Sequence, residues 1–504
     1  MPQVINIGLI LLIYYWGFGS FAFNSLLLMN REDNTSSASY QFRHPWIKWV
    51  GYGGLVLLVI LSAVFYRERS LFIDIAYQTF LMIKDGTVQV QVYRFGSAIV
   101  QILPLMAIKL GLPLQIVLLC YSLSFTLLFL LFYWIIVRGL KNEYLGWVLV
   151  FLFTLMVYDA FYWATSEYQQ GLAFLLVVFA FVMRYPRLDH WRQWVLLVPF
   201  AIALAYYHPL VFIIFIFLWG FFFLQNDQLR HWRYGALLGT MLLVVGFKSK
   251  FSGNWYDDNK YRIFFENLTE HFPNYFAFES HQKFLQDAIQ HWYFLPIFLV
   301  VITGFYLRWR EWLKLGWILA FSFGYLMLLH ISSPSATYRF YAEVNYMPLS
   351  IVLMTPFIFD VVPKIKRKAW VLYLFAGIVA IRLLTIALHH QPYTERLTWM
   401  ETQLDRHTSA QSNRLLLELD EKKRDTLLMT WGVAYESLLL SAMKHPDSAR
   451  TMVVLPKGKR YDTALQSDTS FVTELTEYPI DVVDGRYYRL GEQTYKSIST
   501  STGQ

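Results

Sequence analysis

The stretch GYGGLVLLVILSAVFYRERSLFIDIAYQTF, residues 51–80, joins an apolar run to a segment of a different kind. A membrane-spanning helix needs roughly 20 mostly apolar residues, and the run that ends near residue 66 meets that requirement. The segment LFIDIAYQTFLMIKDG (71–86) follows, with Asp74 and Tyr77 three residues apart and hence on one face of a helix. A plain membrane anchor has no use for such a segment.

The composition of the whole chain, like this apolar run, indicates a membrane protein. Its 504 residues are 56% hydrophobic and 19% aromatic, and only 15% are charged, which is too apolar for a soluble domain of this length. We therefore expect an α-helical polytopic membrane protein. The only cysteine, Cys120, lies inside an apolar run, so a disulfide framework or a cysteine metal site within the chain is excluded.

The apolar runs predict about twelve transmembrane helices. The N-terminal run lacks a charged leading region and a small-residue cleavage site, so we expect it to be a retained helix. The predicted spans are residues 4–28, 49–66, 113–137, 143–161, 168–184, 193–207, 209–225, 233–248, 293–308, 315–331, 342–361 and 369–388.

Basic residues predict the orientation of these spans, because Lys and Arg concentrate in cytoplasmic loops. Five basic clusters recur between spans, at RGLK (138–141), RYPRLDHWR (184–192), RHWR (230–233), RWREWLK (308–314) and KIKRK (364–368). If all five are cytoplasmic, the segments between them and everything after about residue 389 lie outside. The net charge of +8 then orients the protein in the membrane and does not indicate nucleic-acid binding.

Two long connections on the outer side, 67–112 and 249–292, are expected to form interfacial helices. Within the first, residues 95–111 cannot also cross the membrane, and Pro104, Lys109 and Gly111 fit a segment that lies along the interface or re-enters. The second is aromatic and amphipathic, and its length favours helices that cover a cavity.

The tail differs in character from the rest of the chain, which divides it into a membrane domain, 1–388, and an extracytoplasmic α/β domain, 389–504. Helical periodicity occurs in RLTWMETQLDRH (396–407), in SNRLLLELDEKKR (412–424) and in GVAYESLLLSAMKH. Strand-like runs with turn signals follow, which predicts a small soluble α/β fold.

Polar residues on the predicted outer side are the candidates for chemistry. Each of these residues, taken alone, has an ordinary structural explanation as a helix cap, a solvated side chain or a turn residue. Their shared position at helix ends on one face gives them weight, because a cavity between the helices would bring them together. They are Asp74, Glu167, His208 and Arg339.

This layout resembles the GT-C superfamily of membrane glycosyltransferases, which use polyprenyl-phosphate-linked sugars, and within it the protein O-mannosyltransferases and the aminoarabinose transferases. The resemblance runs through FIDIAYQTF with Asp74, the interfacial run ILPLMAIKLGLP, and SEYQQGLAFLLVVFAF with Glu167. It implies a sugar donor on a polyprenyl phosphate, and an acceptor that is a lipid, a glycan or a protein. The single cysteine suits a bacterial inner membrane with the active site and the C-terminal domain on the periplasmic side, which is the location we expect.

The chemistry of such a transfer gives each candidate a role. The acceptor hydroxyl must lose its proton, and Asp74 is the candidate general base, flanked by Tyr77. Glu167 orients the acceptor, helps to bind a metal or holds a cation. The phosphate leaving group needs cations or hydrogen-bond donors. The available groups on the outer face are Arg94, Arg339, Lys84 and His208, with Tyr338 beside Arg339.

The sequence departs from the family where a metal would bind. The first outer loop lacks a paired Asp-Glu or an Asp-x-Asp, which leaves open whether a divalent cation takes part. Asp257 and Asp258 are adjacent acids in the second connection, but neighbouring side chains point in different directions on a helix or a strand.

Two other functions stay open at this level. A polymerase that joins lipid-linked polysaccharide units would also expose acids and arginines on the outer side. A transporter or flippase for a lipid-linked substrate would instead place polar residues near the membrane midplane in matching halves, and the sequence has no such repeat.

Overall fold

The computed structural model describes most of the chain. It covers residues 40–335, 338–407, 412–420, 424, 427–456, 468–483 and 485–498. The predicted span 4–28 lies outside the described residues.

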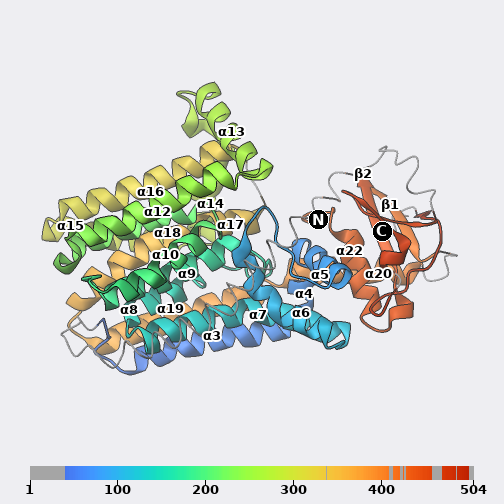
Figure 1. Ribbon diagram of the computed structural model, residues 1–504, viewed down its shortest axis with the longest axis horizontal. Helices are drawn as coiled ribbons and strands as arrows, with labels where there is room; N and C mark the ends of the chain where they lie inside the picture. Colours follow the sequence, from blue (N-terminus) through green and yellow to red (C-terminus); the bar gives the residue numbers. More distant parts are fainter. Residues whose placement is uncertain are drawn as a thin grey trace.

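Long helices lie side by side along the longest axis of the molecule, and the strands gather at one end (Figure 1). The helices up to the middle of the chain are α3 (Trp46–Val64), α4 (Tyr66–Ser70), α5 (Asp74–Asp85), α6 (Ile102–Lys109), α7 (Leu114–Trp134), α8 (Glu143–Leu152), α9 (Glu167–Arg184), α10 (Trp191–Ala205), α11 (Val211–Gln225) and α12 (Trp232–Phe251). The later helices are α13 (Trp255–Glu270), α14 (Glu279–Gln290), α15 (Phe294–Trp309), α16 (Trp312–Ser332), α17 (Arg339–Tyr346), α18 (Pro348–Pro356), α19 (Lys368–Leu388), α20 (Gln391–Arg406) and α22 (Val433–Ala442).

The apolar helices are compatible with an integral membrane protein. By length and composition, five helical segments in the described part of the chain could cross a membrane, or seven if two bent pairs each count as one span. The five are Trp46–Val64, Leu114–Gly139, Trp312–Ser332, Arg339–Lys364 and Lys368–Arg406, and the bent pairs are α12 with α13 and α14 with α15. The twelve predicted spans are therefore not confirmed.

The other predicted spans form helices that are shorter or more polar than expected. α8, α10 and α11 have only 10 to 15 residues. The predicted span 143–161 is interrupted because α8 ends at Leu152 and the chain turns through buried residues before α9. α9 begins with the polar residues EYQQ, which lower its mean hydropathy.

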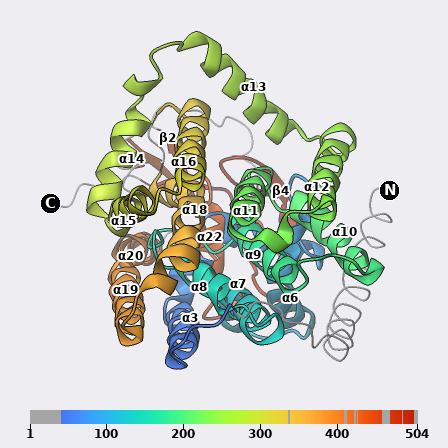
Figure 2. The same ribbon diagram turned by 90° about the vertical axis from the view of Figure 1, so that its left-hand side faces the viewer.

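The turns that carry the basic clusters lie at the end of the bundle away from the strands. Contacts between these turns join them: Asn226 donates to the Tyr40 hydroxyl at 3.1 Å, and His231 lies 2.7 Å from the Pro186 carbonyl oxygen. Lys314 pairs with Asp360 at 3.1 Å. The helices alternate in direction from this end, so residues 71–86 and the N-terminus of α9 lie at the opposite end (Figures 1 and 2).

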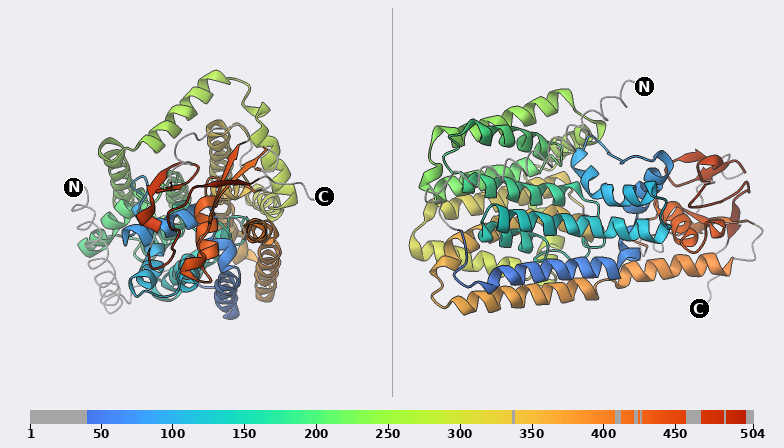
Figure 3. Two further views of the ribbon diagram at one scale, coloured as in Figure 1. Left: turned by 90° about the vertical axis from the view of Figure 1, so that its right-hand side faces the viewer. Right: turned by 60° about the horizontal axis from the view of Figure 1, so that its bottom comes forward.

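The tail forms a small α/β region beyond that opposite end. Its sheet has the order β2–β1–β5 with parallel pairs, and β3 and β4 form a separate antiparallel pair. The strands are β1 (Arg414–Leu419), β2 (Thr451–Pro456), β3 (Ser470–Val472), β4 (Glu477–Pro479) and β5 (Lys496–Ile498). α20 continues from the end of α19 toward this region (Figure 3).

Within the tail, the helical expectation holds for α20 and α22 and is wrong for residues 414–419 of the predicted helix 412–424. The segment RLLLEL there is the central strand β1, paired with β2 and β5. A short apolar run that is buried between neighbours does not alternate, so its pattern does not distinguish a strand from a buried helix.

α5 packs against the tail. Its buried residues Ala76 and Phe80 belong to the same hydrophobic cluster as Tyr435, Phe471 and Tyr488 of the tail. Phe80 lies 5.1 Å from the Tyr435 ring, centroid to centroid. The segment 71–86 therefore lies between the helical bundle and the α/β region.

Candidate functional site

Asp74 is the first residue of α5 and lies partly buried at the end of the bundle. An acidic residue is favoured there by the helix dipole. The Trp163 indole N–H donates to Asp74 Oδ2 at 2.9 Å. Burial raises the pKa of Asp74 to about 6, with the charge of Glu167 adding to the effect and the Trp163 hydrogen bond opposing it. The helix ends at Gly86, which adopts φ 61° and donates its N–H to the Met82 carbonyl.

Glu167 is positioned by the start of α9. Ser166 caps this helix, because its side chain accepts from the Gln169 N–H at 3.4 Å. The carboxylate of Glu167 pairs with Arg94, with 3.7 Å between Oε2 and Nη1.

Arg94 connects two acids that are far apart in the sequence. In addition to its Glu167 pair, its Nη2 donates to Asp257 Oδ1 at 3.1 Å. The three side chains are only 11 to 17% exposed, so each charge depends on the others for compensation. We call Asp74, Arg94, Glu167 and Asp257 the Arg94 cluster.

Asp257 reaches this cluster because α13 begins at residue 255. Asn254 caps α13, accepting from the N–H groups of Tyr256 and Asp257 at 3.1 and 2.9 Å, and its own amide donates to Asp257 Oδ2 at 2.8 Å. The Tyr256 ring lies under the Arg94 guanidinium, 5.4 Å from its centroid. The connection 249–292 thus contains the helices α13 and α14, and Asp257 in it meets Arg94 in the connection 67–112.

His208 lies next to the Arg94 cluster. Its ring stacks on Tyr168 of α9 with 4.6 Å between centroids, and its Nδ1 accepts from the Leu210 N–H at 3.2 Å. Burial lowers the pKa of His208 well below its usual value, and the charges of Arg94 and Lys248 lower it further. The imidazole is therefore neutral near pH 7 and acts as a dipole.

Four buried polar atoms on the elements of this cluster have no hydrogen-bond partner within the described residues. They are Arg94 Nε, Thr79 Oγ1 on α5, and Gln169 Nε2 and Gln170 Oε1 on α9. A buried polar atom without a partner is costly, so such atoms are a feature of sites that receive a polar ligand.

Arg339 belongs to a second group of charges. It donates from Nε to Asp159 Oδ2, and its Nη1 and Nη2 lie 3.2 and 3.0 Å from the Nε2 atoms of His291 and His389. Burial raises the pKa of Asp159, but the hydrogen bond from His389 and the charge of Arg339 outweigh it and hold the pKa below its usual value. We call these four residues the Arg339 cluster.

Aromatic side chains of Trp163, Phe340 and Tyr341 lie between the two clusters. Trp163, which donates to Asp74, packs edge-on against Tyr341 at 4.7 Å and lies 5.5 Å from Phe340. Phe340 and Tyr341 follow Arg339 directly on α17.

The structure places the remaining candidates elsewhere. Lys84 pairs with Asp85 at 2.5 Å and lies 6.0 Å from the Tyr478 ring of the tail. Tyr77 packs on Trp431 and Tyr435 of the tail at 5.9 and 5.1 Å. Tyr338 stacks on Phe340 at 5.9 Å.

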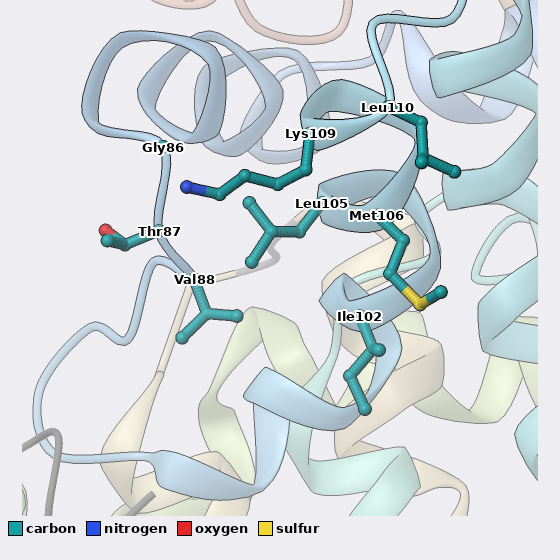
Figure 4. Close-up of a pocket in the computed structure, with 8 residues that line it drawn as sticks. All are labelled: Gly86, Thr87, Val88, Ile102, Leu105, Met106, Lys109 and Leu110. Atoms are coloured by element: carbon teal, nitrogen blue, oxygen red, sulfur yellow. The ribbon is translucent and has the colours of Figure 1, made fainter.

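An apolar pocket of about 490 Å³ lies between the end of α5 and α6 (Figure 4). Lys109 extends across it toward Gly86, and apolar side chains form its other walls. Its lining residues are Gly86, Thr87, Val88, Ile102, Leu105, Met106, Lys109 and Leu110. The predicted interfacial segment 95–111 thus contributes α6 to one side of a pocket that suits a hydrocarbon chain.

Comparisons with family models, with curated proteins and with solved structures found no match to this chain. In the part of the chain that the structure describes, no group of three or more His, Cys, Asp or Glu side chains is arranged to hold a metal ion. The function must therefore be inferred from the arrangement of the two clusters.

The site contains residues that sequence reasoning did not select. Trp163 and Asp159 both lie in the segment DAFYWATSE that precedes Glu167, and this dense polar and aromatic segment between two apolar helices was a usable signal. His291 and His389 each follow a helix end, and only the folded structure brings them to Arg339.

Proposed function

We propose that the protein is an integral-membrane glycosyltransferase that moves a sugar from a polyprenyl-phosphate carrier to an acceptor hydroxyl. The transfer takes place on the periplasmic face of a bacterial inner membrane. One observation carries the proposal: Asp74, a carboxylate with a pKa raised to about 6, senses the charge of Glu167, which pairs with a buried arginine that also binds Asp257. Perturbed carboxylates beside a fixed cation are a feature of sites that transfer protons.

Asp74 acts as general base. The acceptor oxygen forms a bond to the anomeric carbon, and the bond from that carbon to the phosphate oxygen breaks. The bonding pair leaves with the polyprenyl phosphate, and the acceptor proton moves to Asp74. A carboxylate with a pKa near 6 is ionised at pH 7 and is a stronger base than an ordinary aspartate.

Arg94 stabilises the leaving phosphate. Its Nε has no partner among the residues that the structure describes, while Glu167 and Asp257 hold its Nη atoms and fix the plane of the guanidinium. A guanidinium fixed in advance stabilises growing negative charge without reorganisation. Neutral His208 is close enough for Arg94 to affect its pKa and supplies a further dipole.

The apolar pocket beside α6 supports a lipid-linked donor. Its walls suit a prenyl chain, and Lys109 supplies a cation at the same place. Both features fit an anionic polyprenyl lipid.

A polysaccharide polymerase is the second candidate, because it must hold two lipid-linked units. The Arg339 cluster, with three cationic or potentially cationic side chains around Asp159, is a second place for a phosphate group. In that function Arg94 and Arg339 would each serve one substrate.

The test is transfer of radiolabelled sugar from total polyprenyl-linked sugars in membranes that contain matched amounts of each variant. Asp74→Asn is compared with Asp85→Asn, a change of the same chemistry at the other end of α5, where Asp85 pairs with Lys84 near the surface. Loss of transfer only in Asp74→Asn supports the proposal. Equal transfer in both variants would show that the base lies elsewhere, and joining of repeat units without transfer of single sugars would favour the polymerase.

A further inference from the structure

The residue before Asp74 has an unusual backbone. Ile73 is fully buried and adopts φ 40° and ψ −102°. A β-branched residue at positive φ is an outlier, because its side chain crowds the backbone, and such a conformation persists only where the surroundings enforce it. The turn into α5, which aims Asp74, is therefore held by its neighbours.

A buried ion pair from the tail holds this turn. The Ile73 N–H donates to Glu436 Oε1 at 3.1 Å. Arg396 donates to both oxygens of the same carboxylate, from Nε to Oε2 at 2.8 Å and from Nη2 to Oε1 at 2.7 Å. Glu436 is completely buried and Arg396 is 3% exposed. A bidentate ion pair of this kind fixes the orientation of the carboxylate as well as its position.

The backbone of the tail also approaches the turn closely. A Cβ atom added at Gly432 would lie 2.8 Å from the Ile73 Cα, so only glycine fits at this position. On the other side of the turn, the Arg396 guanidinium lies over the Phe72 ring, 5.6 Å from its centroid. Phe72 and Ile73 thus contact α20 and α22 before the chain enters α5.

We propose that Glu436, held by Arg396, is a positioning residue that fixes the Ile73 peptide and thereby directs the Asp74 carboxylate toward the Arg94 cluster. The tail is then part of the catalytic unit. This inference deepens the proposed function and rests on the role of Asp74 in it. Glu436 touches no reacting atom, and it acts only through the backbone of the residue next to the base.

The first test measures the contact without using activity. Hydrogen exchange of the Ile73 amide is followed by mass spectrometry on full-length protein in detergent, for wild type, Glu436→Leu and Glu436→Gln. A hydrogen bond to a charged group is lost in Glu436→Leu, so the amide should exchange about 10- to 100-fold faster. Glu436→Gln keeps an acceptor oxygen and should restore most of the protection.

A matched control separates this effect from general damage. Glu395→Leu makes the same change on α20 next to Arg396, where Glu395 is exposed and bonds to Gln391. It should leave exchange of the Ile73 amide as in wild type. Unchanged exchange in Glu436→Leu, or equal acceleration in both leucine variants, overturns the proposal.

The second test measures transfer of sugar. Glu436→Leu should lower kcat while KM for the donor stays within about twofold, and it should cause no further loss in an Asp74→Asn background, because residues that act as a unit are not additive. Faster exchange with an unchanged kcat overturns the positioning role. If wild type transfers no sugar, the proposed function fails, and exchange at Ile73 alone then decides whether Glu436 holds the turn.

Discussion

Arg94 and Arg339 lie at the same end of the helical bundle, and both bind acids, yet their surroundings differ. Arg94 holds two acids at 3.1 and 3.7 Å and leaves its Nε without a partner among the described residues. Arg339 uses all three nitrogens, on Asp159 and on two histidines. The adjoining carboxylates also differ, since the pKa of Asp74 is raised and that of Asp159 is lowered.

Under the proposed function, this difference would separate a reactive arrangement from a structural one. Within the described part of the chain, Asp74 receives one side-chain hydrogen bond, from a neutral indole, so it keeps proton affinity. Asp159 contacts a guanidinium and an imidazole, and this pairing lowers its affinity for a proton. We therefore expect chemistry at the Arg94 cluster and structural support at the Arg339 cluster.

The largest effect should come from removing the base. Asp74→Asn keeps the shape of the side chain and loses the proton acceptor, so transfer should fall by about 100- to 10,000-fold. Asp159→Asn should cost far less transfer, because that carboxylate serves Arg339. The comparison is made by kcat in purified protein, and a larger loss in Asp159→Asn would reverse the assignment of the two clusters.

The next effect should come from the cation. Arg94→Ala should lower kcat by about 100- to 1,000-fold, the usual loss when one stabilising donor is removed. Arg94→Lys keeps the charge but cannot hold two acids in one plane, so it should recover only part of the rate. Full activity in Arg94→Lys would mean that charge alone matters there.

Removing the second arginine should affect stability more than rate. Arg339→Ala leaves Asp159, which is 7% exposed, without its guanidinium and should lower the free energy of unfolding by about 1–3 kcal/mol. Thermal unfolding of the purified protein in detergent measures this change. A fall in kcat beyond about tenfold with unchanged stability would favour the polymerase, in which Arg339 serves a second substrate.

The sequence predicted the positions of the helices better than it predicted which charged residues pair with one another. Apolar runs and basic turns predicted a helical bundle whose candidate residues share one end, because these features are local in the chain. The same local signals overestimated the number of spans, since the turn after Leu152 and the polar start of α9 interrupt apolar runs. They also missed strand β1, which is buried between two neighbours.

The site depends on contacts between distant segments, and the local patterns of a single sequence do not show which segments meet. Arg94 and Asp257 are 163 positions apart, and Ile73 and Glu436 are 363 apart. The acids and the arginine were recognisable as candidates. Their pairing follows from the packing of α13 against the first outer connection and of α22 against α5, which periodicity does not reveal.

The smallest predicted effect is the pH dependence, and it falls in different pH ranges in the two clusters. Burial raises the pKa of Asp74 to about 6, so the base is protonated below that pH and transfer should fall by about tenfold for each further pH unit. His208 stays neutral across this range because burial lowers its pKa.

Asp159 titrates at a lower pH than Asp74. Its pKa is held below the ordinary value of 3.8, so its pairing stabilises the fold above that pH, and this contribution is lost only as the pH falls further, through the lowered pKa. Between pH 7 and 5, kcat should therefore fall while the Arg339 contribution to stability persists. This contribution is measured as the difference in unfolding temperature between wild type and Arg339→Ala. If this difference disappeared over the same pH range as the activity, Asp159 would be titrating with Asp74, and the two clusters would be one coupled site.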